Sequence, residues 1–394
     1  MRQYLFFFLS ILFTTTAFGQ VNGLIEARTL QAEGKLQEAL TVINKTVATT
    51  EFSEDGGAWY TYAEVNKTLF QSAVGESEKS EYLSQAIKGY QMTLKYPSEN
   101  VRINLSAGQS IDLLYQNLIQ SGATLYQQQK YEAALDAFTN AIIIESKDST
   151  ILTYAANAAL QAGLYDQAIA NFQKLLKLTP KQRIYQSMVS IQKDSQKDLE
   201  GALETIENAK KDFPESYVFD RYKLDILLAS ERDREAIDLI SEILERDSVN
   251  SQLSLRKAIL HDKFITKLKE VSPLDSAALQ QEIDLAEASY LESLVGNANN
   301  VTANFNLAML YNDQANTYYR SINAMTMDQY KAEHEAYEEK ALGFIQKALP
   351  LMKRASEQKP EDIGILRTLA AYYDRLSMGD EKRTTEAKIT ELGG

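Results

Sequence analysis

The sequence predicts an all-α protein, an α-solenoid built from stacked helix-turn-helix units. Its central part is periodic, because alanine recurs there at one constant interval: Ala134, Ala168, Ala202 and Ala236. Phenylalanine or isoleucine follows each alanine four residues later, and with only six prolines and 24 % charged residues the composition fits a helical protein. Side chains three or four residues apart share one face of a helix. The pattern therefore predicts amphipathic helices that bury the same face in every unit.

Small residues recur where the two helices of a unit would cross. Twelve residues before each alanine the positions are mostly small: Gly122, Ala156, Ser190 and Leu224. A bulky side chain at either crossing position would push the helices apart. Pro180 and Pro214 stand near the ends of two blocks, where a missing N–H and the restriction on the preceding residue stop a helix. The spacing predicts two closely crossing helices in each unit.

This pattern resembles the tetratricopeptide repeat (TPR), a 34-residue unit of a helix, a tight turn and a second helix. The best single match is G-A-T-L-Y-x-x-x-K-Y-E-A-A-L-D-A-F-T-N-A, from Gly122 to Ala141. The resemblance implies that the first helix (helix A) and second helix (helix B) of each unit stack on the next unit and form a right-handed superhelix. Each unit then packs only on its neighbours.

Residues 1–19 are predicted to be a secretory signal peptide. Arg2 gives a positive start, residues 5–13 are apolar, and Ala17-Phe18-Gly19 offers small residues for cleavage before Gln20. The apolar run is too short to span a bilayer comfortably; an uncleaved anchor is the alternative. A leader ending in F-G-Q on a cysteine-free, tyrosine-rich repeat protein resembles exported envelope proteins of the Bacteroidota. We expect a periplasmic protein, with outer-membrane association or secretion as alternatives.

The mature chain divides into a series of predicted units. They are two TPR-like units in 20–98, the second with an insertion; a helical extension in 99–114; four regular units in 115–250; a unit with an insertion in 251–300; a unit with a long helical insertion in 301–362; and a capping unit in 363–394. The insertions near 72–82, 262–277 and 312–341 are candidates for partner specificity, because insertions in repeat proteins gather on one face. The last of them lacks glycine and proline, which predicts extended helices. Pro350 predicts a kink or a late start of the helix that follows.

Composition argues against several classes of function. The net charge of -13 argues against nucleic acid and anionic membranes as ligands, and we expect no membrane insertion once the leader is removed. The absence of cysteine excludes thiolate chemistry. His334-Glu335 lacks the second histidine of a zinc protease motif, and His261 falls at a packing position. We therefore expect no catalytic residues, no cofactor and no metal; an enzyme of unrecognised type is a remaining alternative, and the oligomeric state stays open.

The resemblance also implies a binding groove lined by helix A at positions 2, 5, 9, 12 and 13 of each unit. By register these residues are Gln116, Ile119, Ala123, Tyr126, Gln127, Thr150, Thr153, Asn157, Leu160, Gln161, Ile184, Ser187, Ile191, Asp194, Val218, Arg221, Asp225 and Leu228. This mixed, largely neutral lining suits an extended peptide or a helix. The carboxylate clamp of the chaperone-binding members is excluded, because Thr153 stands where that clamp needs lysine, although Asn157 matches its asparagine.

These observations predict a non-enzymatic protein-protein interaction scaffold of the cell envelope, which binds a peptide or helix of a partner in its concave groove. The identity of the protein partner stays open. The alternative is a binding or assembly factor for envelope glycan or outer-membrane machinery, in which tyrosines stack on sugars. Exposed tyrosines clustered on one face would favour this alternative, and tyrosines buried between helices would favour the scaffold.

Overall fold

The computed structural model describes residues 23–270 and 276–394, so the predicted signal peptide 1–19 lies outside the described residues. Helices account for the secondary structure of these two ranges, and no strand occurs in them. The all-α fold of paired helices is therefore as predicted. The chain divides into two compact bodies, Met1–Glu215 and Ser216–Gly394, called here the N-terminal and C-terminal bodies.

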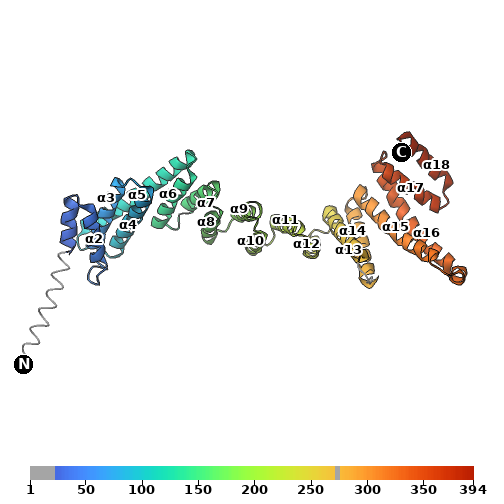
Figure 1. Ribbon diagram of the computed structural model, residues 1–394, viewed down its shortest axis with the longest axis horizontal. Helices are drawn as coiled ribbons and strands as arrows, with labels where there is room; N and C mark the ends of the chain where they lie inside the picture. The colour runs from blue at the N-terminus through green and yellow to red at the C-terminus, as the bar shows by residue number, and fades with distance from the viewer. Residues whose placement is uncertain (1–22, 271–275) are drawn as a thin grey trace, which may run out of the picture. The chain divides into compact units, whose positions relative to one another are not determined.

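The N-terminal body is a row of helices in which each helix packs against the next one in the chain (Figure 1). After a helical segment at 23–32, its elements are α2 (Leu36–Val47), α3 (Gly56–Ser72), α4 (Glu76–Lys95), α5 (Val101–Gln127), α6 (Tyr131–Ile144), α7 (Ser149–Gln161), α8 (Tyr165–Leu178), α9 (Gln182–Ser190), the π-helix η1 (Ile191–Gln196) and α10 (Leu199–Asp212). The predicted extension at 99–114 and helix A of the third unit form the single long helix α5.

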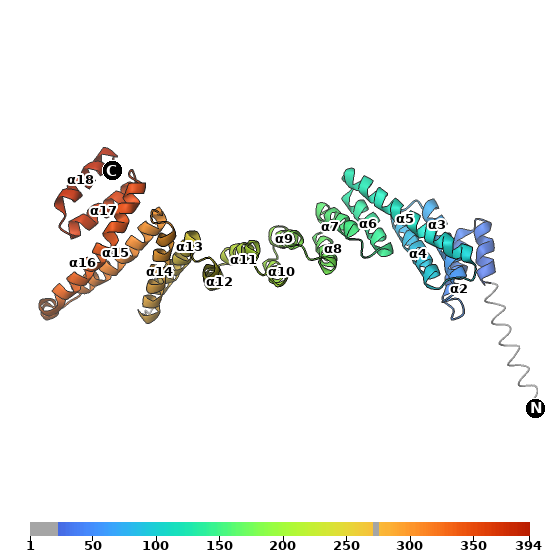
Figure 2. The same cartoon turned by 180° about the vertical axis from the view of Figure 1, so that it is seen from behind.

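The C-terminal body continues the alternation of helix A and helix B (Figure 2). Its elements are α11 (Tyr217–Ala229), α12 (Asp233–Arg246), α13 (Ser251–Glu270), α14 (Ser276–Gly296), α15 (Val301–Asn323), α16 (Met327–Gln358), α17 (Ile363–Arg375) and α18 (Gly379–Glu391). None of the helices in the described ranges combines the length and the apolarity that a membrane crossing needs.

The period of the sequence appears directly in the helix boundaries. Helix B of the four regular units begins at Tyr131, Tyr165, Leu199 and Asp233, and these starts are spaced by the same interval as the recurring alanines. The turn before it contains one residue with positive φ at the same place: Gln129 (62°), Gly163 (74°), Lys197 (58°) and Glu231 (54°). In three of these turns the next backbone N–H donates to a carbonyl five residues earlier, as from Lys130 to Leu125, which is the Schellman bond that ends a helix.

The small residues do lie where helices cross closely. A Cβ on Gly89 of α4 would lie 2.8 Å from the Cβ and 2.9 Å from the Cα of Ala63 on α3. A Cβ on Gly122 of α5 would lie 2.6 Å from Cε1 of Phe138 on α6. Ala134 of α6 is fully buried. Close helix approach is therefore the physical reason for small residues in this phase, as the sequence predicts.

The insertion at 312–341 forms helix, as its lack of glycine and proline predicts. It makes up the far part of a long pair, α15 and α16, which turn at residues 324–326, and Thr326 and Gln329 form a capping box there. Figures 1 and 2 both show this turn away from α17 and α18. Of the two alternatives predicted from Pro350, a kink or a late helix start, the late start is wrong, because α16 runs through this residue; the kink stays a prediction. Pro350 and Gln346 are both exposed, so water can satisfy the carbonyl that the missing N–H leaves free.

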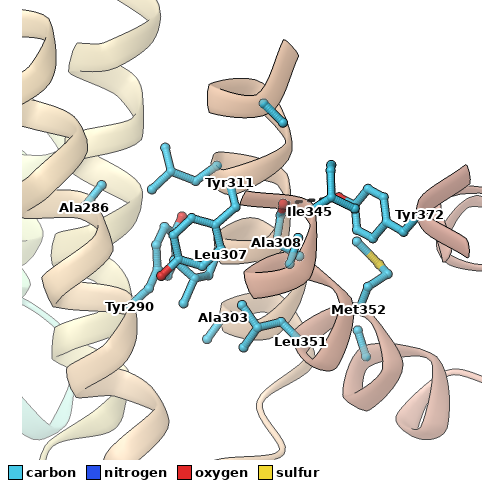
Figure 3. Packing of buried hydrophobic residues seen from close by; sticks show 14 of the residues in the cluster. Ala286, Tyr290, Ala303, Leu307, Ala308, Tyr311, Ile345, Leu351, Met352 and Tyr372 are labelled. Carbon is cyan, nitrogen blue, oxygen red and sulfur yellow. Dashed lines mark hydrogen bonds between the residues drawn. The ribbon is translucent and has the colours of Figure 1, made fainter. Parts of the chain in front are cut away.

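The apolar core of the C-terminal body is rich in tyrosine (Figure 3). Tyr290 of α14, Tyr311 of α15 and Tyr372 of α17 are buried among alanine, leucine and isoleucine. The Tyr372 hydroxyl donates to the carbonyl of Ala308 at 3.2 Å, shown as a dashed line. These rings fill the space between successive helices.

Tyrosine hydroxyls also tie helices together by donating to carboxylates. The pairs are Tyr90 with Glu64, Tyr115 with Asp148 (2.6 Å), Tyr185 with Asp212 (2.7 Å), Tyr290 with Asp262, and Tyr311 with Glu287 (2.7 Å). Burial, together with the neighbouring carboxylate, raises the pKa of each of these tyrosines. The hydroxyls therefore stay protonated and keep donating throughout the neutral range.

Candidate functional site

The candidate site is the exposed side of the helix A elements, called here the helix-A face. It is carried by α5, α7, α9 and η1 in the N-terminal body and by α11 and α13 in the C-terminal body. Of the 18 predicted groove residues, Ile191 is buried at 4 % exposure and packs in the core, and the others are half-buried or exposed. Three hollows lie on this face.

The first hollow has a volume of about 300 Å³ and lies between α5 and α7. Its lining consists of Ala123, Tyr126, Gln127, Phe138, Tyr154 and Asn157. The Phe138 and Tyr154 rings lie 5.6 Å apart between centroids. Phe138 belongs to helix B and reaches the hollow where Gly122 has no side chain in its way. The hollow is thus an aromatic pocket with two amides at its edge.

The polar groups around this first hollow have free hydrogen-bonding capacity. Within the described chain, the side-chain amides of Gln127 and Asn157 and the hydroxyls of Tyr126 and Tyr154 have no hydrogen-bond partner. Amides both donate and accept. An extended peptide backbone, which presents alternating donors and acceptors, is chemically matched to such a rim.

The second hollow has a volume of about 380 Å³ and is formed by α7, α9 and η1. The predicted residues Leu160, Ser187 and Ile191 line it, together with Ser195, which lies 34 residues after Gln161 at the same repeat position but was not among the predicted residues. The predicted Asp194 does not line this hollow. Asp194 instead accepts a hydrogen bond from the Ser190 hydroxyl at 3.0 Å.

The third hollow is larger, about 820 Å³, and lies in the C-terminal body between α11 and α13. The predicted residues Arg221 and Asp225 line it on α11, where Tyr217 is 54 % exposed. On α13 the lining includes Arg256 and Ile259, which were not among the predicted residues, because these end with the sixth unit; Ile259 lies 34 residues after Asp225, at the same repeat position. This hollow combines apolar walls with charged groups of both signs.

The remaining predicted residues lie on helix A elements outside the three hollows. They are Gln116, Ile119, Thr150, Thr153, Gln161, Ile184, Val218 and Leu228. The Thr153 hydroxyl donates to the Ser149 carbonyl at 2.7 Å, so it is engaged within its own helix. The repeat register therefore selects residues of helix A, and hollow-lining residues from other helices or other positions of helix A lie outside it.

Neither histidine forms a catalytic arrangement. His261 is 1 % exposed, and its Nδ1 lies 2.7 Å from Glu282, which also pairs with Arg234 at 2.6 Å. Burial lowers the pKa of His261, so it is neutral at pH 7. The His334 ring stacks on the Tyr330 ring, with 4.2 Å between the ring centroids. Within the described ranges no group of three or more His, Cys, Asp or Glu side chains is placed to hold a metal ion.

The fold and the helix-A face define the class as a helical repeat protein. A tetratricopeptide repeat family model matches residues 125–190, which include helix B of the third unit and all of the fourth. This stretch of the chain is therefore similar to the tetratricopeptide repeat family. Such proteins generally act as protein-binding scaffolds and are typically non-enzymatic; no enzyme family matched.

Three solved structures are similar over long stretches. The C-terminal part of a TPR repeat-containing protein from Cytophaga hutchinsonii has 12 % identity and a TM-score of 0.38, and the match covers 70 % of this chain and 95 % of that one. For a TPR repeats protein from Bacteroides fragilis the identity is 15 %, the TM-score 0.31 and the coverage 66 % and 98 %. YrrB, a TPR protein with an unusual peptide-binding site, has 14 % identity and a TM-score of 0.29, and the match covers 47 % of this chain and 88 % of that one. The comparison with curated proteins found no match.

Proposed function

We propose that this protein is a non-enzymatic interaction scaffold exported to the cell envelope, most naturally the periplasm, where its helix-A face binds an extended peptide or a helix of a partner protein. The export part rests on the leader pattern of residues 1–19. The binding part rests on one observation: helix A elements contribute most of the lining of each of the three hollows described above. A rigid, preformed surface loses little conformational entropy on binding.

The environment of the tyrosines favours the scaffold over the sugar-stacking alternative. Among the described tyrosines, only Tyr154, Tyr217 and Tyr330 are exposed. Several others are buried between helices and hydrogen-bonded to carboxylates. A tyrosine held in this way cannot present a ring face to a sugar. Tyrosine therefore serves mainly to join helices in this protein.

The proposal is tested by capturing partners from a native envelope extract with the mature chain from Gln20 onward. The test variant changes Tyr126, Asn157 and Arg221 to alanine; the first two come from the α5 and α7 walls of the first hollow, and Arg221 comes from the α11 wall of the third. A control variant changes Asn117 and Arg367 to alanine, because both are exposed and lie outside the three hollows. Circular dichroism at 222 nm establishes that both variants keep their helix content.

We expect one partner to be recovered by the mature chain and by the control, and lost with the test variant. Recovery of the same partner with the test variant would show that the helix-A face is not the binding surface. A further variant replaces the far part of α15 and α16, residues 312–341, with a short turn. Loss of the partner with this variant alone would assign specificity to the insertion instead.

A further inference from the structure

We propose that the third hollow, between α11 and α13, binds a carboxylate group of an extended partner segment through Arg221 and Arg256. The inference rests on the proposed function and adds the chemistry of the ligand. It concerns residues of the sixth and seventh units, and not the position in the fourth unit where Thr153 excludes the chaperone-type clamp.

The two arginines of this hollow are chemically available. Arg221 and Arg256 both line it and are exposed. Within the described chain neither guanidinium has an ion pair or a hydrogen bond; Arg221 lies only near a ring, 6.0 Å from the centroid of Tyr222. Arg246, at the end of α12, shows the contrast, because it pairs with the buried Asp220 at 2.9 Å. A guanidinium without a partner can form two parallel hydrogen bonds to a carboxylate.

The acidic groups in the hollow form no ion pair with these two arginines. Asp220 is engaged by Arg246, and Asp247 accepts a hydrogen bond from the Asn250 amide at 3.1 Å. Asp225 is the remaining carboxylate of the lining, and it has no ion pair within the described residues. Arg221 and Arg256 therefore share the hollow with two carboxylates that form no ion pair within the described chain, Asp225 and Asp247. Neither arginine is held by them, so both guanidiniums can bind a carboxylate of a ligand.

The overall acidity of the protein does not oppose this local attraction. The net charge is -13, but exposed charges farther apart than about 8 Å are largely screened at physiological ionic strength. The charge felt inside the hollow is thus set by the residues that line it. Asp225 weakens the attraction, so Asp225→Asn is expected to strengthen binding of an acidic ligand.

The walls indicate what stands beside the carboxylate. Leu253, Leu255 and Ile259 of α13 and the exposed ring of Tyr217 line the same hollow. Its volume of about 820 Å³ exceeds what one carboxylate fills. A partner segment with an acidic group next to a large apolar residue would satisfy both parts of the lining.

Selection of random displayed peptides tests the proposal with a defined probe. The mature chain is used as bait, in parallel with the double variant Arg221→Gln and Arg256→Gln. A matched control, Arg354→Gln and Arg367→Gln, removes the same charge from two other exposed arginines, which lie outside the three hollows. We expect the mature chain and the control to enrich peptides containing Asp or Glu beside an apolar residue, and the double variant to lose that enrichment.

The two ideas can fail separately. If peptides are enriched without any acidic preference, or if the double variant retains the preference, the carboxylate site is refuted while peptide binding stands. If no peptide is enriched by any bait, the proposed function fails and the carboxylate site fails with it.

Synthetic versions of an enriched peptide separate the possible sources of the carboxylate. Each is made with Asp or Asn at the acidic position, and with a free or an amidated C-terminus. Loss of about tenfold or more in affinity on changing Asp to Asn assigns a side chain, and the same loss on amidation assigns the chain end. If neither the change from Asp to Asn nor amidation weakens binding, the proposal is refuted. Binding to the correct peptide should also weaken as salt is raised.

Discussion

The close crossing of α3 and α4, where the neighbouring atoms include backbone, makes Gly89→Ala a sharp test of the packing argument. In an open helix interior, alanine is more favourable than glycine by about 0.5–1 kcal/mol. At Gly89 the added Cβ would meet the Cβ, Cα and backbone N of Ala63 at 2.8–2.9 Å. Ordinary contacts begin at 3.4 Å, so α3 and α4 would have to separate by a few tenths of an ångström. The obstructing atoms include backbone, which cannot rotate away.

Overpacking of this kind typically costs about 1–3 kcal/mol. Set against the intrinsic gain of alanine, we expect Gly89→Ala to lower the free energy of unfolding by roughly 0.5–2 kcal/mol. The controls are Gly108→Ala in α5 and Gly343→Ala in α16, where no atom lies within 4 Å of the added Cβ. Both controls should raise stability by about 0.5–1 kcal/mol.

Urea unfolding followed by circular dichroism at 222 nm gives the comparison, since the three variants differ from the parent by the same methyl group. Repeat arrays can unfold in more than one step, so hydrogen exchange of the α3 and α4 amides is measured as well. Faster exchange confined to these helices is expected for Gly89→Ala. A Gly89→Ala protein as stable as the controls would refute the argument that close approach selects the small residue.

Three further predictions concern single contacts. Burial and the hydrogen bond to Asp212 raise the pKa of Tyr185 from its ordinary 10.0 to about 12. The contribution of the protonated hydroxyl to stability is therefore fully present below pH 10 and is lost as the pH rises through about 12. In urea titrations at alkaline pH, Tyr185→Phe should lose less stability with rising pH than the parent protein. Asp148 caps α7, and its pKa is lowered by the Tyr115 hydroxyl, so Asp148→Ala should cost about 1 kcal/mol at neutral pH, and less as acid protonates the parent's carboxylate. Lys197 has a φ of 58°, a backbone conformation that glycine adopts without strain. Lys197→Gly should therefore raise the free energy of unfolding by up to about 1 kcal/mol, which is measured as a higher thermal midpoint.

Much of the fold could be predicted because the repeat imposes the same local requirement many times. Each regular unit needs a small residue where its two helices cross, so alanine recurs at a constant interval from Ala134 to Ala236 and can be recognised from the sequence alone. The starts of helix B, which recur at the same interval as these alanines, confirm that phase. The π-helix η1 could not be predicted, because it changes the hydrogen-bonding pattern without changing the type of residue.

The candidate site was predicted less completely, because register selects positions on one helix, and a hollow has walls from several. Phe138 reaches the first hollow from helix B, and Arg256 reaches the third from a neighbouring unit. Tyr154 adjoins the predicted Thr153, and only the direction of its side chain decides that it lines the hollow. The hydroxyl–carboxylate bonds, such as Tyr185 with Asp212, also depend on distances that no single repeat reveals.

The regularity of the turns has a consequence for how such a chain changes length in evolution. The residues before three of the second helices have nearly the same φ and ψ: Lys130 (-87°, 67°), Leu164 (-86°, 66°) and Arg232 (-81°, 56°). Excising residues 131–164 would join Lys130 to Tyr165 through a backbone conformation that the junction already adopts. Duplication or deletion of a whole repeat therefore requires no new loop conformation between helices. The recognition surface can be lengthened or shortened in whole modules, while helix geometry at each joint stays the same.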